Sequence, residues 1–188
     1  MRSRTGAVPL KLVCHPQTRM QAVVGIEVVV SGGVSGSLNL AFALQGELSG
    51  LRIPEPRQPR RVSGLWQHTC FEVFVMAEQG AGYREFNFSP SREWAAYTFR
   101  GYREGGELEI EMAPVNMVQR GRDRLELHAE LHQACLPPGC SLRLGLSAVV
   151  EDTDGQRSYW ALRHPPGRPD FHHADAFALQ LNSPECVT

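Results

Sequence analysis

The sequence predicts an all-β protein, a sandwich or barrel of about ten or eleven short strands in one domain. Three observations support this fold class. Apolar residues recur mainly at every second position, which is the side-chain period of a strand. Clusters of Gly, Pro and Asp separate these segments, and the chain holds 18 Gly and 13 Pro. No window long enough for a helix carries a convincing apolar stripe, and 188 residues can bury a sizeable core.

In the first half of the chain, the predicted strands are rich in β-branched and aromatic residues. The first two carry Val and Ile, and the third has an apolar residue at every second position from Leu38 to Leu44. The fourth is apolar on both faces except for Glu72, and the next two alternate aromatic with polar residues. These strands are expected at 8–14, 21–31, 38–44, 69–77, 83–89 and 94–102.

In the second half, charged residues alternate with the apolar ones. Leu108, Ile110 and Met112 alternate with glutamates, and the next strand alternates Leu or Ala with Glu and His. These strands are expected at 107–112, 125–131, 141–151, 157–163 and 176–181. Two segments lack the period: the Pro- and Arg-rich stretch 53–61 predicts a loop, and 113–121 predicts a short helix or an irregular turn.

Charge and composition exclude several classes of function. Lys and Arg number 19 against 20 Asp and Glu, so the formal net charge is −1. This balance argues against a protein that binds nucleic acid through a large basic face, and against a polybasic membrane tether. No apolar stretch follows the basic N-terminal residues, and the most apolar run, 22–30, is too short to span a bilayer. We therefore expect a cytoplasmic protein whose five cysteines are free thiols.

Two clusters contain candidate metal ligands. The first consists of His128, His132, Cys135 and Cys140. Positions four apart on a strand lie about 13 Å from each other, whereas two imidazoles on one zinc must bring their nitrogens within about 4 Å. A solvated strand face is therefore expected instead. The second cluster runs from Asp170 to Asp175 and includes His172 and His173. Adjacent histidines on an extended chain point to opposite sides, so this loop predicts a ligand pocket or structural hydrogen bonds, and no metal site.

The sequence carries no familiar catalytic signature. It has no G-x-S-x-G elbow, no Gly-rich phosphate loop and no H-E-x-x-H motif. Glu72 and Glu85 lie on neighbouring predicted strands, where two carboxyls about 5–9.5 Å apart in a cleft could hydrolyse a glycoside. Acidic residues on strands are more often solvent-facing or hydrogen-bonded. We therefore expect no enzyme, with this carboxylate pair as the alternative.

The aromatic residues of two strands predict a binding face. If the alternation holds, the core contains Phe71, Phe86, Phe88, Tyr97 and Phe99. The opposite surface of the same sheet then carries Trp94 and Tyr102 with Arg100 between them, beside Tyr83, Glu85 and Asn87. Flat aromatic faces beside bidentate polar groups suit a sugar, whose C–H face stacks on a ring while its hydroxyls are hydrogen-bonded. Alternatively, Trp94 and Tyr102 only cover the second face of a sandwich sheet beneath a loop.

Three blocks of the sequence stand out. They are LWQHTCFEVFV at 65–75, YREFNFSPS at 83–91 leading to WAAY at 94–97, and SYWALRHP at 158–165 followed by PDFHH at 169–173. Together they resemble the bacterial DOMON-like domains related to family-9 carbohydrate-binding modules, over residues 62–181. The resemblance implies an antiparallel β-sandwich of immunoglobulin-like or jelly-roll type. It also implies a binding module, since sugars and haem are ligands across the wider superfamily.

The resemblance also carries over to single positions. Those that match the motifs are Trp66, Glu72, Asn87, Trp94, Tyr97, Trp160, His164, Asp170 and His172, of which Tyr97 is most expected in the core. Haem-binding relatives use a Met and a His as axial ligands. Met76 and His164 are candidates for these two, but neither stands in a haem motif, so no cofactor is expected.

Taken as a whole, residues 1–188 predict one non-catalytic domain that binds a carbohydrate or a similar polar small molecule. Trp94 and Tyr102 would be stacking platforms, and Glu72, Asn87 and Arg100 would bind hydroxyls. His164 and His172, from late loops, would close the pocket, and Trp66 and Trp160 complete the candidate set. The alternatives are a protein–protein interaction module, a haem-binding domain and a carboxylate-pair hydrolase.

Overall fold

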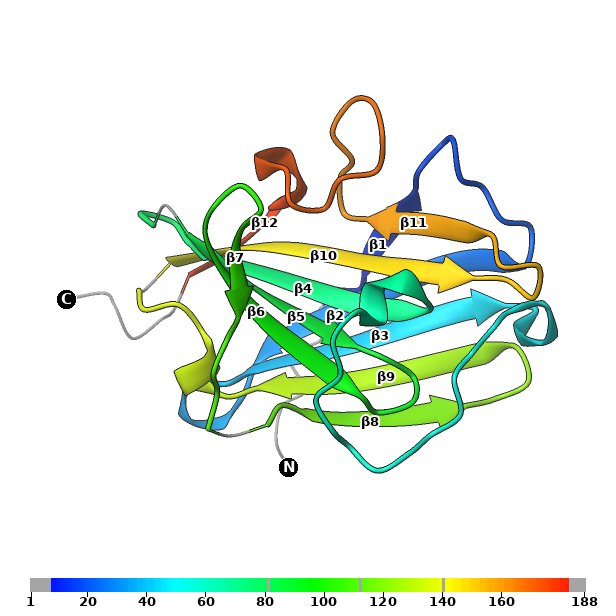
Figure 1. The fold of residues 1–188 in the computed structure, drawn as a ribbon, viewed down its shortest axis with the longest axis horizontal. Helices are drawn as coiled ribbons and strands as arrows, with labels where there is room; N and C mark the ends of the chain where they lie inside the picture. The colour runs from blue at the N-terminus through cyan, green and yellow to red at the C-terminus, as the bar shows by residue number, and fades with distance from the viewer. Residues whose placement is uncertain (1–7, 81, 112, 140, 183–188) are drawn as a thin grey trace.

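Two antiparallel sheets pack face to face in the computed structural model, which describes residues 8–80, 82–111, 113–139 and 141–182 (Figure 1). Sheet A has the order β1-β2-β3-β9-β8, and sheet B the order β7-β6-β5-β4-β10-β11 with β12 also paired to β10. The strands of sheet A are β1 (Leu10–Cys14), β2 (Val23–Gly32), β3 (Leu38–Gly46), β8 (Val115–Arg120) and β9 (Arg124–Leu131). Those of sheet B are β4 (Cys70–Ala77), β5 (Tyr83–Phe88), β6 (Trp94–Gly101), β7 (Glu104–Glu107), β10 (Ser141–Glu151), β11 (Arg157–Ala161) and β12 (Leu179–Asn182).

Strand β1 connects the two sheets. Its first residues, Leu10 to Leu12, pair with β2 of sheet A, and Val13 and Cys14 pair with β11 of sheet B. The chain therefore closes one side of the sandwich. This architecture confirms the predicted all-β antiparallel fold.

The core lies between the sheets and is built from the inward faces of both. Phe42 on β3 and Phe71 on β4 meet there with their ring centroids 5.1 Å apart. Leucines of β3 and β9 surround Phe42, and valines of β4 flank Phe71. The alternation read from the sequence therefore marks the core correctly on β3, β5 and β9.

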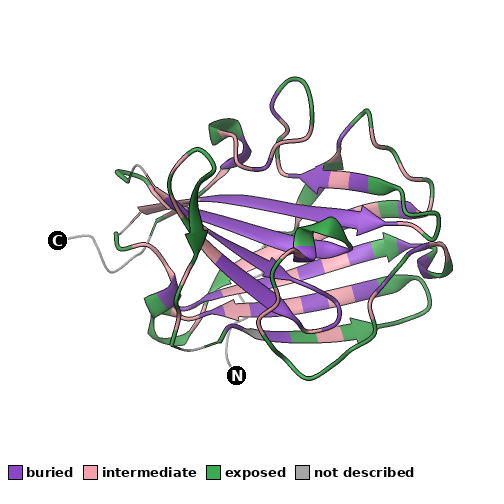
Figure 2. Ribbon diagram, viewed as in Figure 1, coloured by how far each residue is buried: buried purple, intermediate pink, exposed green. Residues whose placement is uncertain are grey.

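The outer faces of the two sheets differ in burial. In Figure 2 the strands of sheet A are banded, because buried residues alternate with intermediate or exposed ones. The central strands of sheet B are buried almost throughout, on both faces. Segments that cover the outer face of sheet B cause this difference, and this covered face holds the candidate site.

Helical structure in the described part of the chain is limited to short 3-10 turns: η1 (Val34–Gly36), η2 (Leu48–Gly50), η3 (Leu65–Gln67), η4 (Gln133–Cys135) and η5 (Ala174–Ala176). No helix among these residues is long and apolar enough to cross a bilayer. The helix or turn predicted at 113–121 is wrong, because β8 occupies most of that segment. The strand predicted at 107–112 is misplaced: β7 ends at Glu107, and Met112 lies outside the described residues.

The face predicted for β6 is reversed. Trp94 lies opposite Phe88, which faces the core, and the indole is only 6 % exposed within that core. Tyr97 and Phe99, predicted in the core, therefore point outward from sheet B, as Tyr83 and Glu85 opposite them do. Apolarity did not distinguish the two faces of this strand, because Trp94, Ala95 and Ala96 are buried on both faces, whereas Thr98 and Arg100, which share the face of Trp94, are exposed.

Removing the Phe42 ring should test the inter-sheet core. We expect Phe42→Ala to lower the free energy of unfolding by about 3–5 kcal/mol, because a buried aromatic side chain leaves a cavity between β3 and β4. Urea denaturation measures this change. Val24→Ala, at an exposed position of β2, should change it by about 0.5 kcal/mol or less. Equal effects of the two substitutions would contradict the packing described.

Candidate functional site

A solvent-open cavity of about 560 Å³ lies on the outer face of sheet B. Strands β4, β5, β6, β10 and β11 contribute to it, together with the η3 turn and the covering segment 162–178, which is drawn orange to red between β11 and β12 (Figure 1). Its volume lies within the range of small-molecule sites. The lining residues are Thr18, Trp66, Glu72, Glu85, Tyr97, Phe99, Arg103, Val149, Tyr159, Arg168, Pro169, Phe171 and His172.

Two buried carboxyls, those of Glu72 and Glu85, line this cavity, and with Asn87 and Ser147 beside them they form a polar group on the outer face of sheet B that is called the floor below. Asn87 on β5, Glu72 on β4 and Ser147 on β10 lie directly opposite one another across the sheet. Glu85 stands two residues before Asn87 and so shares its face. All four are at most 4 % exposed. The strand register thus gathers these groups where water is largely excluded.

Several atoms of the floor have no partner in the protein. Among the described residues, no hydrogen bond reaches Glu72 Oε1, Asn87 Oδ1 or Ser147 Oγ. The amide nitrogen Nδ2 of Asn87 donates to Glu85 Oε1 at 2.8 Å. Buried polar groups are nearly always hydrogen-bonded, and a free one costs about 1–3 kcal/mol. Three such atoms on adjacent strands leave this part of sheet B with buried polar groups that the described residues do not satisfy.

The two carboxyls of the floor resist ionisation. Burial raises the pKa of Glu85 to about 7, although the hydrogen bond from Asn87 and the guanidinium of Arg103 pull it down. Burial, together with repulsion from Glu85, raises the pKa of Glu72 well above its usual value. Near neutral pH the two groups therefore share protons and titrate as a pair.

The rim beside Glu85 is held by an ion pair. Arg103, at the turn between β6 and β7, donates from Nη2 to Asp170 Oδ1 at 2.9 Å, and Tyr102 Oη donates to Asp170 Oδ2 at 2.7 Å. Burial opposes the charge on Asp170, but these two hydrogen bonds lower its pKa. This ion pair ties the covering segment to the end of β6.

His172 lies between the rim and the floor. Tyr83 Oη accepts the backbone N–H of Arg103 and lies 2.8 Å from His172 Nδ1, so we assign the tyrosine proton to that nitrogen. His172 Nε2 then carries its own proton and faces Glu85 Oε2 at 3.7 Å. Burial, with the positive charge of Arg103, lowers the pKa of His172 to about 4. The imidazole is therefore neutral near neutral pH.

Aromatic rings form the walls. The rings that line the cavity belong to Trp66, Tyr97, Phe99, Tyr159 and Phe171. Phe99 stacks on Tyr83 at 4.7 Å and meets the edge of His172 at 5.1 Å, so its position is fixed. Trp66 is 50 % exposed at the mouth. The cavity thus places flat apolar faces around a polar floor.

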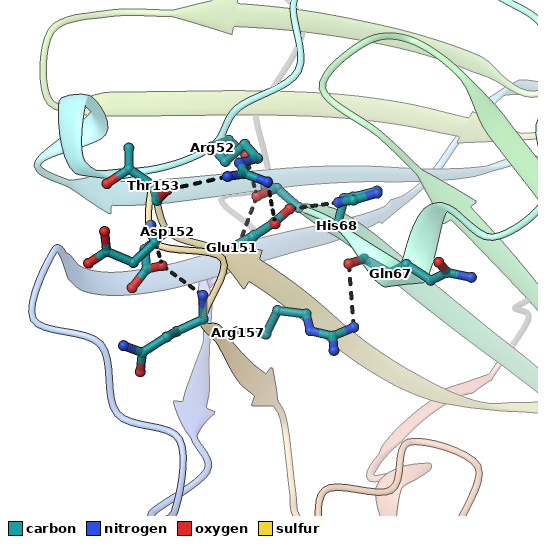
Figure 3. Close-up of polar contacts among 10 residues, drawn as sticks. Arg52, Gln67, His68, Glu151, Asp152, Thr153 and Arg157 are labelled. Atoms are coloured by element: carbon teal, nitrogen blue, oxygen red, sulfur yellow. Dashed lines mark hydrogen bonds and ion pairs between the residues drawn. The ribbon is translucent and has the colours of Figure 1, made fainter.

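A buried carboxylate anchors the turn that carries Trp66. Figure 3 shows Glu151 between two partners: His68 Nδ1 lies 2.7 Å from Oε2, and Arg52 Nη1 donates to Oε1 at 3.0 Å. Arg157 also donates to the backbone carbonyl of residue 67. These contacts hold the two residues that follow Trp66, Gln67 and His68, and so keep the 3-10 turn against β10.

The structure brings four of the sequence-predicted residues together. Glu72, Trp66 and His172 line the cavity, and Asn87 lies opposite Glu72 on the neighbouring strand and on the same face. They come from three separate parts of the chain. Their approach depends on the pairing of β4 with β5 and on the return of the covering segment over sheet B.

The other five predicted residues lie elsewhere. The indoles of Trp94 and Trp160 are in the core, because each faces inward from its strand. Tyr102 lies in the turn after β6, where it binds Asp170, and Arg100 is exposed and paired with Glu104. His164 Nε2 contacts the backbone carbonyl of Val13. Trp94 and Tyr102 are therefore not the two stacking platforms of one face.

Sequence reasoning missed most of the walls. Tyr97 and Phe99 had the right alternation but the wrong face, and Tyr159 and Phe171 were not singled out. Phe171 stands between Asp170 and His172 in a block that the resemblance did point to. Arg103 carried no sequence signal, because a turn residue on its own has no period.

The structure also shows where the other candidate clusters lie, namely the metal, haem and hydrolase residues. Among the described residues, no group of three or more His, Cys, Asp and Glu side chains is placed to hold a metal ion. His128 faces Glu126 on β9, and Cys140 of the zinc-like set lies outside the described residues. Met76 packs beside Phe74 on the outer face of β4, whereas His164 binds the backbone of β1. Glu72 and Glu85, the hydrolase pair, do share one face and one cavity.

Comparison with known proteins supports the fold. No protein-family model matches the chain, and no curated protein matches it. Among solved structures, a "putative carbohydrate-binding protein" from Bacteroides uniformis is similar with a TM-score of 0.67 and 14 % identity, over 93 % of this chain and 84 % of that one. A family-9 carbohydrate-binding module from Caldicellulosiruptor kristjanssonii, in complex with glucose, has a TM-score of 0.59 and 8 % identity, over 85 % and 76 % of the two chains.

The raised pKa of Glu85 predicts a dependence of stability on pH. Between about pH 4.5 and pH 7, the unfolded chain releases the Glu85 proton while the folded protein keeps it. The free energy of unfolding of the wild type should therefore fall across this window relative to Glu85→Gln, by about 3 kcal/mol at most. Urea denaturation of both proteins at several pH values measures the difference.

Glu93→Gln is the matched control. Glu93 binds Arg60 and Ser91, which lower its pKa although burial opposes this, so its contribution to stability is lost only at lower pH. Its profile should run parallel to that of the wild type between about pH 4.5 and pH 7. A parallel profile for Glu85→Gln as well would contradict the buried, protonated state of Glu85.

Proposed function

We propose that this protein is a non-catalytic module that binds a carbohydrate or a similar polar small molecule in the cavity on sheet B. One observation carries the proposal: two buried carboxyls, those of Glu72 and Glu85, line a single cavity together with five aromatic residues. Buried polar atoms without a partner lie beside Glu72 on the same face, on Asn87 and Ser147. A pyranose presents hydroxyls at its edge and C–H groups on its face. Its hydroxyls suit the floor, and its C–H face suits the rings.

The similar folds support this proposal. Both solved structures are described as carbohydrate-binding, and one of them holds glucose. At such low sequence identity the fold does not establish the function of this chain, which depends on the residues of its own floor and walls. Membership of the DOMON-like group, which three sequence blocks suggest, is part of the proposal.

Binding fits the carboxyl pair better than hydrolysis does. Glycoside hydrolysis with two carboxyls needs one of them ionised while the other is protonated. Burial raises the pKa of both Glu72 and Glu85, so both are largely protonated below neutral pH. A protonated carboxyl both donates and accepts hydrogen bonds, which suits sugar hydroxyls.

Isothermal titration with a panel of mono- and disaccharides tests the proposal. We expect a dissociation constant between about 1 mM and 1 μM for at least one sugar. Trp66→Ala should weaken binding about tenfold, because it removes a half-exposed ring at the mouth. Met117→Ala, at an exposed position of sheet A, should leave the affinity unchanged.

Two results would contradict the proposal. The first is that no sugar of the panel binds at millimolar concentration. The second is that sugar binds but Trp66→Ala and Met117→Ala behave alike, which would place the ligand outside the cavity. Release of a product from chromogenic glycosides would favour the hydrolase alternative instead.

A further inference from the structure

Acceptors of hydrogen bonds outnumber donors in the floor. Its unpartnered atoms include Glu72 Oε1 and Asn87 Oδ1, of which the amide oxygen is an acceptor and the ionised carboxylate accepts only. Ser147 Oγ can donate one hydrogen bond and accept others. One N–H of the Asn87 amide is directed to Glu85, from Nδ2 to Oε1. The group that this floor needs from a ligand is therefore rich in N–H or O–H donors.

The floor also lacks a cation of its own. Arg103 lines the cavity, but its guanidinium is bound to Asp170 and Tyr102. His172 is neutral near neutral pH and lies 3.7 Å from Glu85 Oε2. Arg168 lines the wall, and nothing indicates that it lowers the pKa of either carboxyl. The positive charge of Arg103 lowers the pKa of both carboxyls, but burial outweighs it, so a cation placed directly against them would favour their ionised form.

The walls add a second attraction for positive charge. The faces of Trp, Tyr and Phe rings carry partial negative charge, and a cation within about 6 Å of such a ring is attracted to it. Rings of Trp66, Tyr97, Phe99, Tyr159 and Phe171 surround the space above the two carboxyls. Acidic floor and aromatic walls together form the kind of enclosure that suits an ammonium group.

We propose that the ligand is an amino sugar whose free, protonated amine lies against Glu72 and Glu85. This inference rests on the proposed function, since the sugar ring still packs on the aromatic walls. An ammonium group offers three donors and no acceptor, so it matches a floor of acceptors more closely than a hydroxyl does. Acetylation of the amine removes its charge and should remove the preference.

Titration calorimetry with three probes tests this inference on the wild-type protein in buffer near pH 7, where the amine is largely protonated and Glu85, with a pKa of about 7, is partly ionised. The probes are glucosamine, glucose and N-acetylglucosamine. We expect glucosamine to bind at least about tenfold more tightly than either neutral sugar, because its contacts to the floor are charge-assisted. Glu72→Gln and Glu85→Gln keep the size of each side chain and should each reduce this preference to about twofold or less.

Glu93→Gln serves as the control, because Glu93 is a buried glutamate in the turn between β5 and β6 that pairs with Arg60 and does not line the cavity. It should keep the full preference for glucosamine. Circular dichroism and thermal unfolding establish that each variant is folded. If a variant is unfolded, the three-probe comparison on the wild type and on the remaining variant decides the inference.

The outcomes separate this inference from the function on which it rests. Equal or tighter binding of glucose overturns the amine assignment and leaves the sugar-binding proposal in place. A preference for glucosamine that survives in both Glu72→Gln and Glu85→Gln also overturns it, because the ammonium group then binds at other residues. Failure of all three probes, and of every other sugar, overturns both proposals.

Discussion

The covering segment 162–178 and the η3 turn remove the outer face of sheet B from water, so β4, β5 and β10 are buried on both sides. The properties of the site follow from this double burial. Polar residues of the outer face, among them Glu72 and Glu85, become buried polar groups rather than solvated ones. Their raised pKa values have burial as the first cause. The aromatic rings that exclude water also supply the walls.

Two kinds of electrostatic arrangement lie side by side in this site. At the rim, Asp170 and Arg103 satisfy each other and tie the covering segment to the sheet. At the floor, the carboxyls are close together and three polar atoms lack partners among the described residues. Unsatisfied buried groups destabilise a protein, and such local violations are expected at functional sites. The rim therefore stabilises the fold, while the floor leaves buried polar atoms unsatisfied.

The likeness to carbohydrate-binding structures at 14 % and 8 % identity shows how little of the sequence the fold constrains. A sandwich requires apolar residues on the inward faces and turns between strands, and many sequences meet that requirement. The outer face of sheet B is free to differ. The contacts of Glu151 with His68 and Arg52 illustrate this freedom: they serve no packing role in the core, yet they hold the turn that carries Trp66 at the mouth of the cavity.

The period of apolar residues by itself determined the fold class, most strand positions and the inward faces of β3, β5 and β9. The motif blocks and the polar positions on strands also identified four candidate residues that lie together in the structure: Glu72, Asn87, Trp66 and His172. Only the tertiary structure decided which face of β6 points inward, because residues of both faces are buried at its start and Trp94 follows the register set by Phe88. It alone placed Arg103, Tyr159 and Phe171 around the floor. Local periodicity reports which residues share a face, whereas long-range pairing decides what covers that face.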